Sequence, residues 1–540
     1  MTGGQAIVGT LTEHGVDTVF GLPGVQLDNT FDALYEARNK VRLIHTRHEQ
    51  GAAYMALGYA QASGRVGVCI TGPGPGLLNT GAALSTAAAS NVPVLCLAGQ
   101  IPSTQIGLGI GMTHEIRDQS AAMRGVVKWV GRADSAGEAP GVMREAFSQM
   151  LETRHQPAVF EMAPDIMGKA ENVTLLPAED YAIDPPLDEA ALNEAAAILN
   201  AAGTPAIFVG SGVFGAEAEL LRLAELLQAP VIMSRTGRGA ISDHHPLAQT
   251  MIAGQELWPN VDAAIAIGTR FVAPSMAWGR MDEVKTIRLD IDAEQAQKPR
   301  AADVTVVARA SAGLKALADR IAAMGRVRPS RLDEYAANRA AAQEKLSGLE
   351  PQYGFARAIR DALPEDGIVV TDVTQMATFL QNWMPVYHPR TLITPSYQGT
   401  LGYGFATALG AKVGCPDKKV VCVSGDGGFM YNVQELSTAM AHGIDLVTIV
   451  FNDNTFGNVK RFQKEHFGGR HIAVDLHNPD FVALAGTFGM KGVKAETPAA
   501  LQAALEDAFA GSGPVLIEVP IGEVPNTWAL VKRPPSAATS

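Results

Sequence analysis

Two acidic residues, Asp426 and Asp453, lie where short apolar runs of the sequence end. Asp426 belongs to the run GDGG at 425–428, which directly follows the apolar stretch 419–424. Glycines let the backbone approach an anion, a helix N-terminus attracts it, and an aspartate binds a hard cation. By itself the pattern is weak, because most such runs are simple turns. It suggests a site for a phosphate group bridged by a metal ion.

The position of Asp453 strengthens this hypothesis. It follows a second apolar stretch, 445–451, and comes 27 residues after Asp426. That separation equals one strand–helix–strand crossover, so we expect both acids side by side at the carboxyl edge of adjacent parallel strands. Mg²⁺ bound by one or two carboxyl ligands and by substrate phosphates fits this arrangement.

The elements that must position these acids follow one pattern along the whole chain. Short β-branched runs alternate with Ala- and Leu-rich stretches, for example at 16–24, 66–74, 93–99, 205–210 and 419–427. Apolar strands that end in glycine-rich turns and lead into helices are typical of parallel α/β sheets. We therefore expect an α/β protein with three consecutive parallel-sheet domains in its 540 residues.

Two segments divide the chain by their composition. Residues 168–188 contain three prolines, several acids and no helical period, which predicts a linker. Residues 325–350 are charged and helix-forming, which predicts a second connector. The expected domains are 1–167, 189–324 and 351–540, each of ordinary size.

The composition excludes several classes of partner. Lys and Arg number 43 and Asp and Glu 55, a net charge of −12, whereas nucleic acids and anionic membranes need a basic surface. The chain is 47% hydrophobic and 18% charged, which favours a well-buried enzyme over disorder. No stretch reaches the ~18 apolar residues of a membrane span, and the N-terminus lacks the basic region of a signal peptide. We expect a cytoplasmic protein with reduced thiols.

The segment 425–454 resembles the cofactor-binding motif of thiamine diphosphate-dependent enzymes. In that motif, GDG is followed by about thirty residues that end in two asparagines, and here Asp453 replaces the second asparagine. Aspartate keeps the oxygen ligand and adds a negative charge. The resemblance implies that Mg²⁺ is bound by Asp426, Asp453 and the main-chain carbonyl group of Thr455.

The same enzymes require a glutamate that faces the aminopyrimidine ring of the cofactor, after a short strand and at the start of a helix. Glu49 meets this requirement, because it follows the run 41–48 and begins a stretch rich in Ala and Gly. A carboxyl group at the start of such an apolar helix is suited to donate a proton. The resemblance implies that Glu49 favours the imino form of the cofactor, whose nitrogen then deprotonates the thiazolium carbon C2 and makes it a nucleophile.

Further segments are similar to acetolactate synthase-like members of this family. They are FGLPG at 20–24, TGPGPGLLNTGAAL at 71–84, PAVFEMAPDI at 157–166 and GTLGYGFATALGAK at 399–412. In the last of these, Leu401 stands where a bulky residue supports the bent conformation of the cofactor. The resemblance implies a pyrimidine-binding, a Rossmann-like central and a diphosphate-binding domain. The implied cofactor-binding residues are Gly24, Glu49, Asn79, Thr374, Gly399, Leu401, Gly425, Asp426, Gly427, Gly428, Asp453, Thr455, Phe456 and Gly457, with Gly427 and Gly428 against the diphosphate.

One motif suggests another cofactor. Residues 210–215, GSGVFG, follow an apolar strand and precede a helix, as in a dinucleotide-binding fingerprint. The acid expected at the end of the next strand is missing, and Arg235 and Arg238 suit a 2′-phosphate or an ADP group instead. In the resembling family the central domain holds FAD in some members, ADP in others and nothing in many, so FAD or ADP stays open here.

The expected substrate pocket departs from that of acetolactate synthases. Their Phe-Gln-Glu element is replaced by Thr113-His114-Glu115, which opens space and supplies a group that titrates near neutral pH. His114 is the candidate acid/base residue, and a purely structural histidine is the alternative. Phe462 replaces the family's tryptophan after the metal loop, and the family's pocket lysine has no clear counterpart. Both losses argue against acetolactate synthesis itself but leave the thiamine chemistry intact.

These patterns predict a thiamine diphosphate- and Mg²⁺-dependent transferase or lyase that decarboxylates or ligates a small 2-oxo acid. The resemblance implies that Glu49 of one subunit meets cofactor held by another, so the protein is expected to be at least a homodimer. We expect a homotetramer. Two alternatives stay open: a carbon–carbon lyase or hydrolase of a 1,2-diketone or 2-hydroxyketone, and an NADP- or flavin-linked oxidoreductase that uses residues 210–215. A catalytically silent binding protein is disfavoured, because Glu49 and the metal acids are all present.

Overall fold

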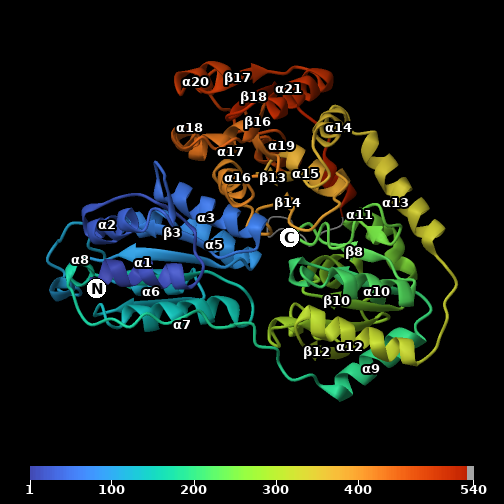
Figure 1. Ribbon diagram of the computed structural model, residues 1–540. Helices are drawn as coiled ribbons and strands as arrows, with labels where there is room; N and C mark the ends of the chain where they lie inside the picture. Colours follow the sequence, from blue (N-terminus) through green and yellow to red (C-terminus); the bar gives the residue numbers. More distant parts are fainter. Residues whose placement is uncertain (532–540) are drawn as a thin grey trace.

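The computed structural model of the protein describes residues 1–531 and contains three six-stranded sheets (Figure 1). All strand pairs within these sheets are parallel. The predicted α/β class with three parallel-sheet units is therefore confirmed. In Figure 1 the first unit lies on the left, the second on the lower right and the third at the top.

The first sheet is built from residues of the N-terminal third of the chain. Its inner strands β3 and β4 are buried along their whole length, as expected for parallel strands that helices cover on both faces. The strand order is β2 (Arg42–His45), β1 (Thr18–Gly21), β3 (Gly67–Thr71), β4 (Val94–Gly99), β6 (Ala158–Met162) and β5 (Trp129–Ala133). The longer helices around it are α1 (Gly3–Glu13), α2 (Asp28–Glu36), α3 (Glu49–Ser63), α5 (Gly81–Ser90) and α7 (Ala139–Leu151).

The second sheet occupies the middle of the chain, and its strands β7 and β10 are likewise fully buried. The strand order is β12 (Val304–Val307), β11 (Lys285–Asp290), β10 (Ala263–Ile267), β7 (Pro205–Val209), β8 (Val231–Met233) and β9 (Ala248–Gln249). Its helices are α9 (Glu189–Ala201), α10 (Glu217–Leu227), α11 (Met251–Leu257) and α12 (Ala310–Ala323).

The third sheet carries the two strands that precede the acidic residues. Gly425 at the end of β15 pairs with Phe451 near the end of β16. The two strands therefore end at the same edge of the sheet. The strand order is β14 (Leu392–Ile393), β13 (Ile368–Thr371), β15 (Val420–Gly425), β16 (Val447–Asn452), β18 (Val515–Pro520) and β17 (Lys491–Lys494). The helices are α14 (Gln352–Ala362), α15 (Gln375–Trp383), α16 (Tyr403–Gly414), α17 (Asp426–Phe429), α18 (Leu436–His442), α19 (Gly457–His466), α20 (Phe481–Thr487) and α21 (Pro498–Ala510).

Two segments connect the three units. Residues 171–188 form neither helix nor strand, as their prolines predict. The second connector contains α13 (Leu332–Ser347), a helix at the right edge of Figure 1 that buries Tyr335, Ala342 and Leu346. Among residues 1–531, no helix is both long enough and apolar enough to cross a membrane.

The first and third units pack together through α3 and α16, whose backbones lie in direct contact. A Cβ atom added to Gly58 would lie 1.9 Å from the carbonyl oxygen of Thr407. One added to Gly410 would lie 1.9 Å from the carbonyl oxygen of Met55. Because only glycine allows so close an approach, this pair sets the distance between the two units.

We predict that Gly58→Ala destabilises the protein by about 1–3 kcal/mol or more, because the new methyl group must push the two helices apart. Denaturant-induced unfolding followed by circular dichroism measures the change. Gly141→Ala in α7 is the control, since a Cβ atom there meets nothing within 4 Å and alanine favours the helix. Equal effects of the two substitutions would contradict this account of the interface.

Candidate functional site

Asp426 lies at the carboxyl edge of the third sheet, as its position after β15 predicts. It begins α17, and its side chain is buried. The amide nitrogen of Asn478 donates to Asp426 Oδ2 at 2.6 Å and to Asn452 Oδ1 at 3.0 Å. Asn478 thereby ties the end of β16 to the start of α17, a role that the sequence pattern did not reveal.

Asp453 is held by its own loop. Its Oδ1 accepts hydrogen bonds from the backbone nitrogen of Thr455 at 2.9 Å and from the Thr455 hydroxyl group at 3.0 Å. Asn454 has a φ angle of 55°, a left-handed conformation that asparagine tolerates. A Cβ atom at Gly457 would lie 2.8 Å from Asp453 Oδ2, so glycine is needed beside this carboxylate.

The electrostatics of the two carboxylates favour a bound cation. Burial, and next the charge of Asp453, raise the pKa of Asp426 to about 6. Burial also raises the pKa of Asp453. A divalent cation between the two groups would relieve both effects. Within residues 1–531 no three His, Cys, Asp or Glu side chains form a metal cluster. A cation bound by these two carboxylates would therefore need carbonyl or phosphate oxygens as its other ligands.

Close packing requires glycine at two positions of the GDGG run. A Cβ atom at Gly427 would lie 2.6 Å from the ring of Phe456, and one at Gly428 would lie 2.9 Å from Asp372 Oδ2. Backbone free of side chains at the start of a helix fits a diphosphate group. The donor set and this cradle therefore agree with the expected cofactor.

Asp372, which the sequence analysis did not single out, organises the same edge. Its carboxylate is buried and accepts hydrogen bonds from the backbone nitrogens of Val373 at 2.7 Å and Gly404 at 3.0 Å. The hydroxyl group of Ser424 donates to it at 3.2 Å. It joins the ends of β13 and β15 to the start of α16. An acid that directly follows an apolar strand is the same signal that identified Asp426, so Asp372 was open to prediction.

Glu49 lies where the sequence places it, at the first turn of α3. Its side chain is 15% exposed, and its Oε2 accepts a hydrogen bond from Asn79 Nδ2 at 3.0 Å. A Cβ atom at Gly76 would lie 3.2 Å from Glu49 Oε1, so this glycine makes room for the carboxylate. The structure thus brings together two residues of the predicted site, with Asn79 in contact with the glutamate.

Glu435 connects the third unit to the segment that leads into α3. This carboxylate is fully buried, and it accepts hydrogen bonds from the backbone nitrogen of Arg47 at 3.1 and 3.3 Å and from the Thr438 hydroxyl group at 2.6 Å. A Cβ atom at Gly51 would lie 2.4 Å from its Oε1. Glu435 belongs to the crossover between Asp426 and Asp453, so one connection touches both halves of the candidate site.

The remaining residues that were predicted to bind the cofactor lie in separate segments of the chain. Thr374 precedes α15, and its hydroxyl oxygen would lie 3.3 Å from a Cβ atom at Gly425. Gly399 has a φ angle of 60°, which favours glycine, and it shares a cavity wall with Thr374. Leu401 is half-buried just before α16. Gly24 lies in an open loop, where a Cβ atom would meet nothing within 4 Å.

His114 lies on an exposed loop with a φ angle of 69°, and its carbonyl oxygen packs directly on Gly74. The carboxylate of Glu115 holds this loop by accepting hydrogen bonds from the backbone nitrogens of Gly109, Gly111 and Met112 at 2.7–3.0 Å. The loop therefore borders the turn that carries Gly76 beside Glu49. The position of this loop near Glu49 agrees with the hypothesis that His114 acts on substrate. That role of His114 stays a prediction.

A cavity of about 1100 Å³ lies between the three units, and the turn 210–215 forms part of its wall. Gly210 packs on the turn after β10, since a Cβ atom there would lie 2.4 Å from the carbonyl oxygen of Gly268. Asp290, at the end of β11, also lines the cavity. Of the two arginines noted in the sequence, Arg235 lines it, whereas Arg238 is buried in an ion pair with Asp243.

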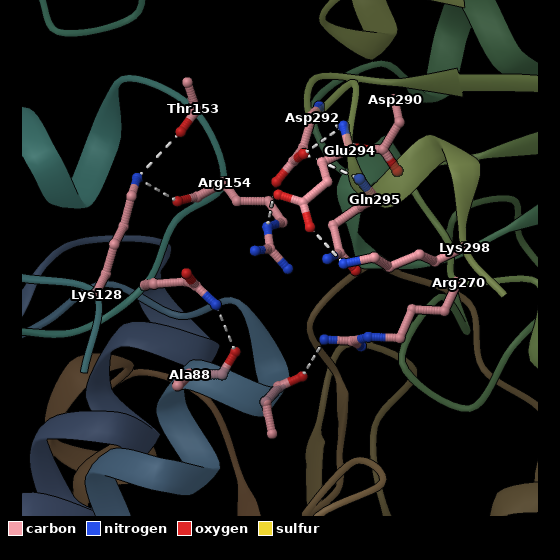
Figure 2. Close-up of polar contacts among 12 residues, drawn as sticks. Ala88, Lys128, Thr153, Arg154, Arg270, Asp290, Asp292, Glu294, Gln295 and Lys298 are labelled. Atoms are coloured by element: carbon pink, nitrogen blue, oxygen red, sulfur yellow. Dashed lines mark hydrogen bonds and ion pairs between the residues drawn. The ribbon is translucent and has the colours of Figure 1, made fainter. Parts of the chain in front are cut away.

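Polar contacts join the first unit to the second beside this cavity (Figure 2). Arg154 Nε lies 2.9 Å from Asp292 Oδ2, and Arg270 donates to the carbonyl oxygen of Ala89 at 2.8 Å. Burial, followed by nearby cationic side chains, lowers the pKa of His155 on the cavity wall to about 4. A glycine turn together with cationic groups suits an anionic ligand.

Comparisons with known families cover all three units. Residues 1–122 match the N-terminal TPP binding domain of thiamine pyrophosphate enzymes, thiamine pyrophosphate (TPP) being another name for thiamine diphosphate. Residues 192–317 match the central domain of these enzymes, and residues 372–519 match their C-terminal TPP binding domain.

Individual relatives align over nearly the whole chain. The acetolactate synthase isozyme 2 large subunit of Escherichia coli is 32% identical, with 100% of this chain and 99% of the relative covered. The probable acetolactate synthase large subunit of Methanocaldococcus jannaschii is 31% identical over 96% of this chain and 92% of its own. The probable 2-ketoarginine decarboxylase of Pseudomonas aeruginosa is 32% identical over 96% and 94%. The chain therefore belongs to the thiamine pyrophosphate enzymes and is similar to acetolactate synthase large subunits.

Proposed function

We propose that the protein uses thiamine diphosphate and Mg²⁺ to decarboxylate a small 2-oxo acid, to ligate it to an acceptor, or both. The observation that carries this proposal is the pair of half-sites described above. One half-site holds Glu49 against Asn79, and the other holds Asp426 and Asp453 beside glycine backbone. A carboxylate for the pyrimidine and a metal–diphosphate cradle are the two features that this cofactor needs.

Each residue then has a defined task. Asp426, Asp453 and the carbonyl group of Thr455 would hold Mg²⁺, and the backbone of Gly427 and Gly428 would lie against the diphosphate. When bound, the cofactor supplies a nucleophilic carbon and an electron sink for the bond that breaks next to the substrate carbonyl group.

Glu49 would exchange a proton with the pyrimidine of the cofactor, and the hydrogen bond from Asn79 fixes the position of its Oε2. His114 would exchange protons with the substrate.

The same proposal covers the assembly. A homodimer is the minimum unit expected, a homotetramer is the favoured form, and a cytoplasmic location is part of the proposal. The relatives named above are acetolactate synthases and a probable decarboxylase, so the diketone lyase and the nicotinamide-linked oxidoreductase are not favoured.

We predict that Glu49→Gln keeps cofactor affinity but lowers turnover of 2-oxo acids by about 100-fold or more, because the amide cannot deliver the proton. Exchange of the C2 hydrogen of thiamine diphosphate for deuterium, followed by NMR, measures the step directly. Removal of Mg²⁺ with EDTA should abolish exchange in the wild type, and added Mg²⁺ should restore it. Near-native turnover by Glu49→Gln would refute the assignment.

Glu435 should act as a positioning residue for Glu49. Glu435→Ala leaves the backbone nitrogen of Arg47 without its carboxylate and should lower kcat and C2 exchange by about 10- to 100-fold, with KM little changed. Glu435→Gln keeps an acceptor oxygen and should recover most of both rates. Thr438→Val, which removes only the hydroxyl contact, is the matched control. A loss of thermal stability without a loss of exchange would mean that Glu435 is merely structural.

We further propose that the 1100 Å³ cavity takes FAD or ADP, given its glycine turn, its arginines and Asp290. Protein purified without added nucleotide should release one of the two on heating. Absorbance near 450 nm together with mass spectrometry of the supernatant distinguishes FAD from ADP. If the supernatant of active enzyme holds no nucleotide, the cavity has another role.

A further inference from the structure

Three of the arginines on the wall of the central cavity bind backbone carbonyl groups rather than carboxylates. Arg270 donates to the carbonyl oxygen of Ala89 at 2.8 Å (Figure 2), and Arg390 donates to that of Gln61 at 3.3 Å. Arg288 is buried and donates to three carbonyl oxygens at 2.7–3.4 Å. Among residues 1–531, no ion pair joins any of the three to an aspartate or glutamate. Burial lowers the pKa of each guanidinium group, so a bound anion would stabilise its charge.

The glycine turn 210–215 on the same wall has few free donors for a phosphate group. Four of its backbone nitrogens donate to carbonyl oxygens of the second unit, namely those of Gly210, Gly212, Val213 and Phe214. The backbone nitrogen of Gly215 donates to the carboxylate of Glu217 at 2.9 Å. A phosphate group bound at this turn therefore needs donors from side chains.

Arg390 is placed to supply such donors. Its guanidinium carbon lies 5.5 Å from the centre of the ring of Phe214, which belongs to the turn. A Cβ atom at Gly64 would lie 3.4 Å from the same carbon, so the first unit packs against the guanidinium group as well. Because Arg390 directly precedes the strand segment of the third unit at 391–393, all three units meet at this cation.

His155 lines the cavity from the side of the first unit. Its surface is exposed, although the units around it enclose most of the residue, so the imidazole ring is open to a ligand in the cavity. In the part of the chain that the structure describes, the ring makes no hydrogen bond or ion pair. Burial lowers its pKa, and so do the charges of three cations around it, which are Arg309, Arg390 and Lys128 in order of effect. The ring is therefore neutral until an anion offsets these charges, and it keeps a free N–H donor.

A terminal phosphate group matches these donors better than a diphosphate that is esterified at both ends. Each phosphate of a doubly esterified diphosphate, as in FAD, carries one negative charge. The terminal phosphate of ADP carries up to two charges and offers three acceptor oxygens, which suit a planar guanidinium group. Asp290 acts on Arg270 and Arg288 from beyond ion-pair distance, and burial raises its pKa, so it offsets their charge only in part.

We propose that Arg390 and His155 bind the free terminal phosphate group of a nucleoside diphosphate in the central cavity, which therefore selects ADP over FAD. This inference rests on the nucleotide proposed above for the cavity and narrows it to one class. The side chains, rather than the backbone of the glycine turn, then recognise the phosphate. Selectivity for a free terminal phosphate follows, because its extra charge is what these cations reward.

Isothermal titration calorimetry of the dialysed protein with ADP, the β-methyl ester of ADP and FAD tests the proposal. The wild type should bind ADP about 10- to 100-fold more tightly than the methyl ester, which is nearly the same size but lacks one charge, and more tightly than FAD. Arg390→Met should lose most of the preference for ADP over its ester. Arg390→Lys should keep part of it, because a point charge lacks the paired geometry.

Proton uptake separates a binding role of His155 from a structural one. A phosphate dianion offsets the cations that keep the imidazole ring neutral, so the ring should gain a proton when ADP binds. Titrations at pH 6 in buffers of different ionisation enthalpy count these protons. The wild type should take up more protons than His155→Gln, by up to one per site, and His155→Gln should also bind ADP more weakly.

The control is Arg222→Met in α10, which removes an exposed cation paired with Asp319 and should leave all three affinities unchanged. Equal binding of ADP and its methyl ester by the wild type, tighter binding of FAD than of ADP, or an equal effect of Arg222→Met would overturn the proposal. In each of these cases the cavity still binds a nucleotide, whereas failure of both ADP and FAD to bind refutes the proposed nucleotide itself. If circular dichroism shows that Arg390→Met does not fold, the ligand pair in the wild type and the proton count in His155→Gln decide.

Discussion

The direct contact between the backbones of α3 and α16 is the constraint on which the candidate site depends. Glu49 begins α3, while α16 follows the segment with Gly399 and Leu401 and starts at the carboxylate of Asp372. Because the two helices touch through Gly58 and Gly410, neither can shift along the other without collision. The positions of both half-sites within the chain follow from this one junction.

Two buried carboxylates also hold separate segments of the candidate site together. Asp372 binds backbone nitrogens from two segments of the third unit, and Glu435 binds the backbone nitrogen of Arg47 in the first. Burial raises the pKa of both groups, so their hydrogen bonds offset a desolvation cost. Such groups give little net stability but favour one arrangement of the loops, which is what a site built from separate segments requires.

Local patterns were enough to predict the fold class and the edge of the sheet that carries Asp426 and Asp453. Apolar strands, glycine turns and the length of a crossover are short-range features, and they identify parallel units directly. Asn478 and Glu435 could not be found in this way, because their contacts depend on how distant segments pack. The domain boundaries and the roles of individual site residues, including His114, stay predictions.

The glycine pair also bears on how the protein can diverge. A side chain at Gly58 would need new space opposite it in α16, and one at Gly410 would need space in α3, so neither position can change independently. The first and third units are therefore expected to be inherited together and to resist recombination with foreign counterparts. The middle unit meets the first through contacts such as Arg154 with Asp292. It meets the third through the buried side chain of Arg238, which donates to the carbonyl oxygens of Gln381 and Met384. Because Thr374 and Gly399 also line the central cavity, a change of its ligand would affect the cofactor half-site of the third unit as well.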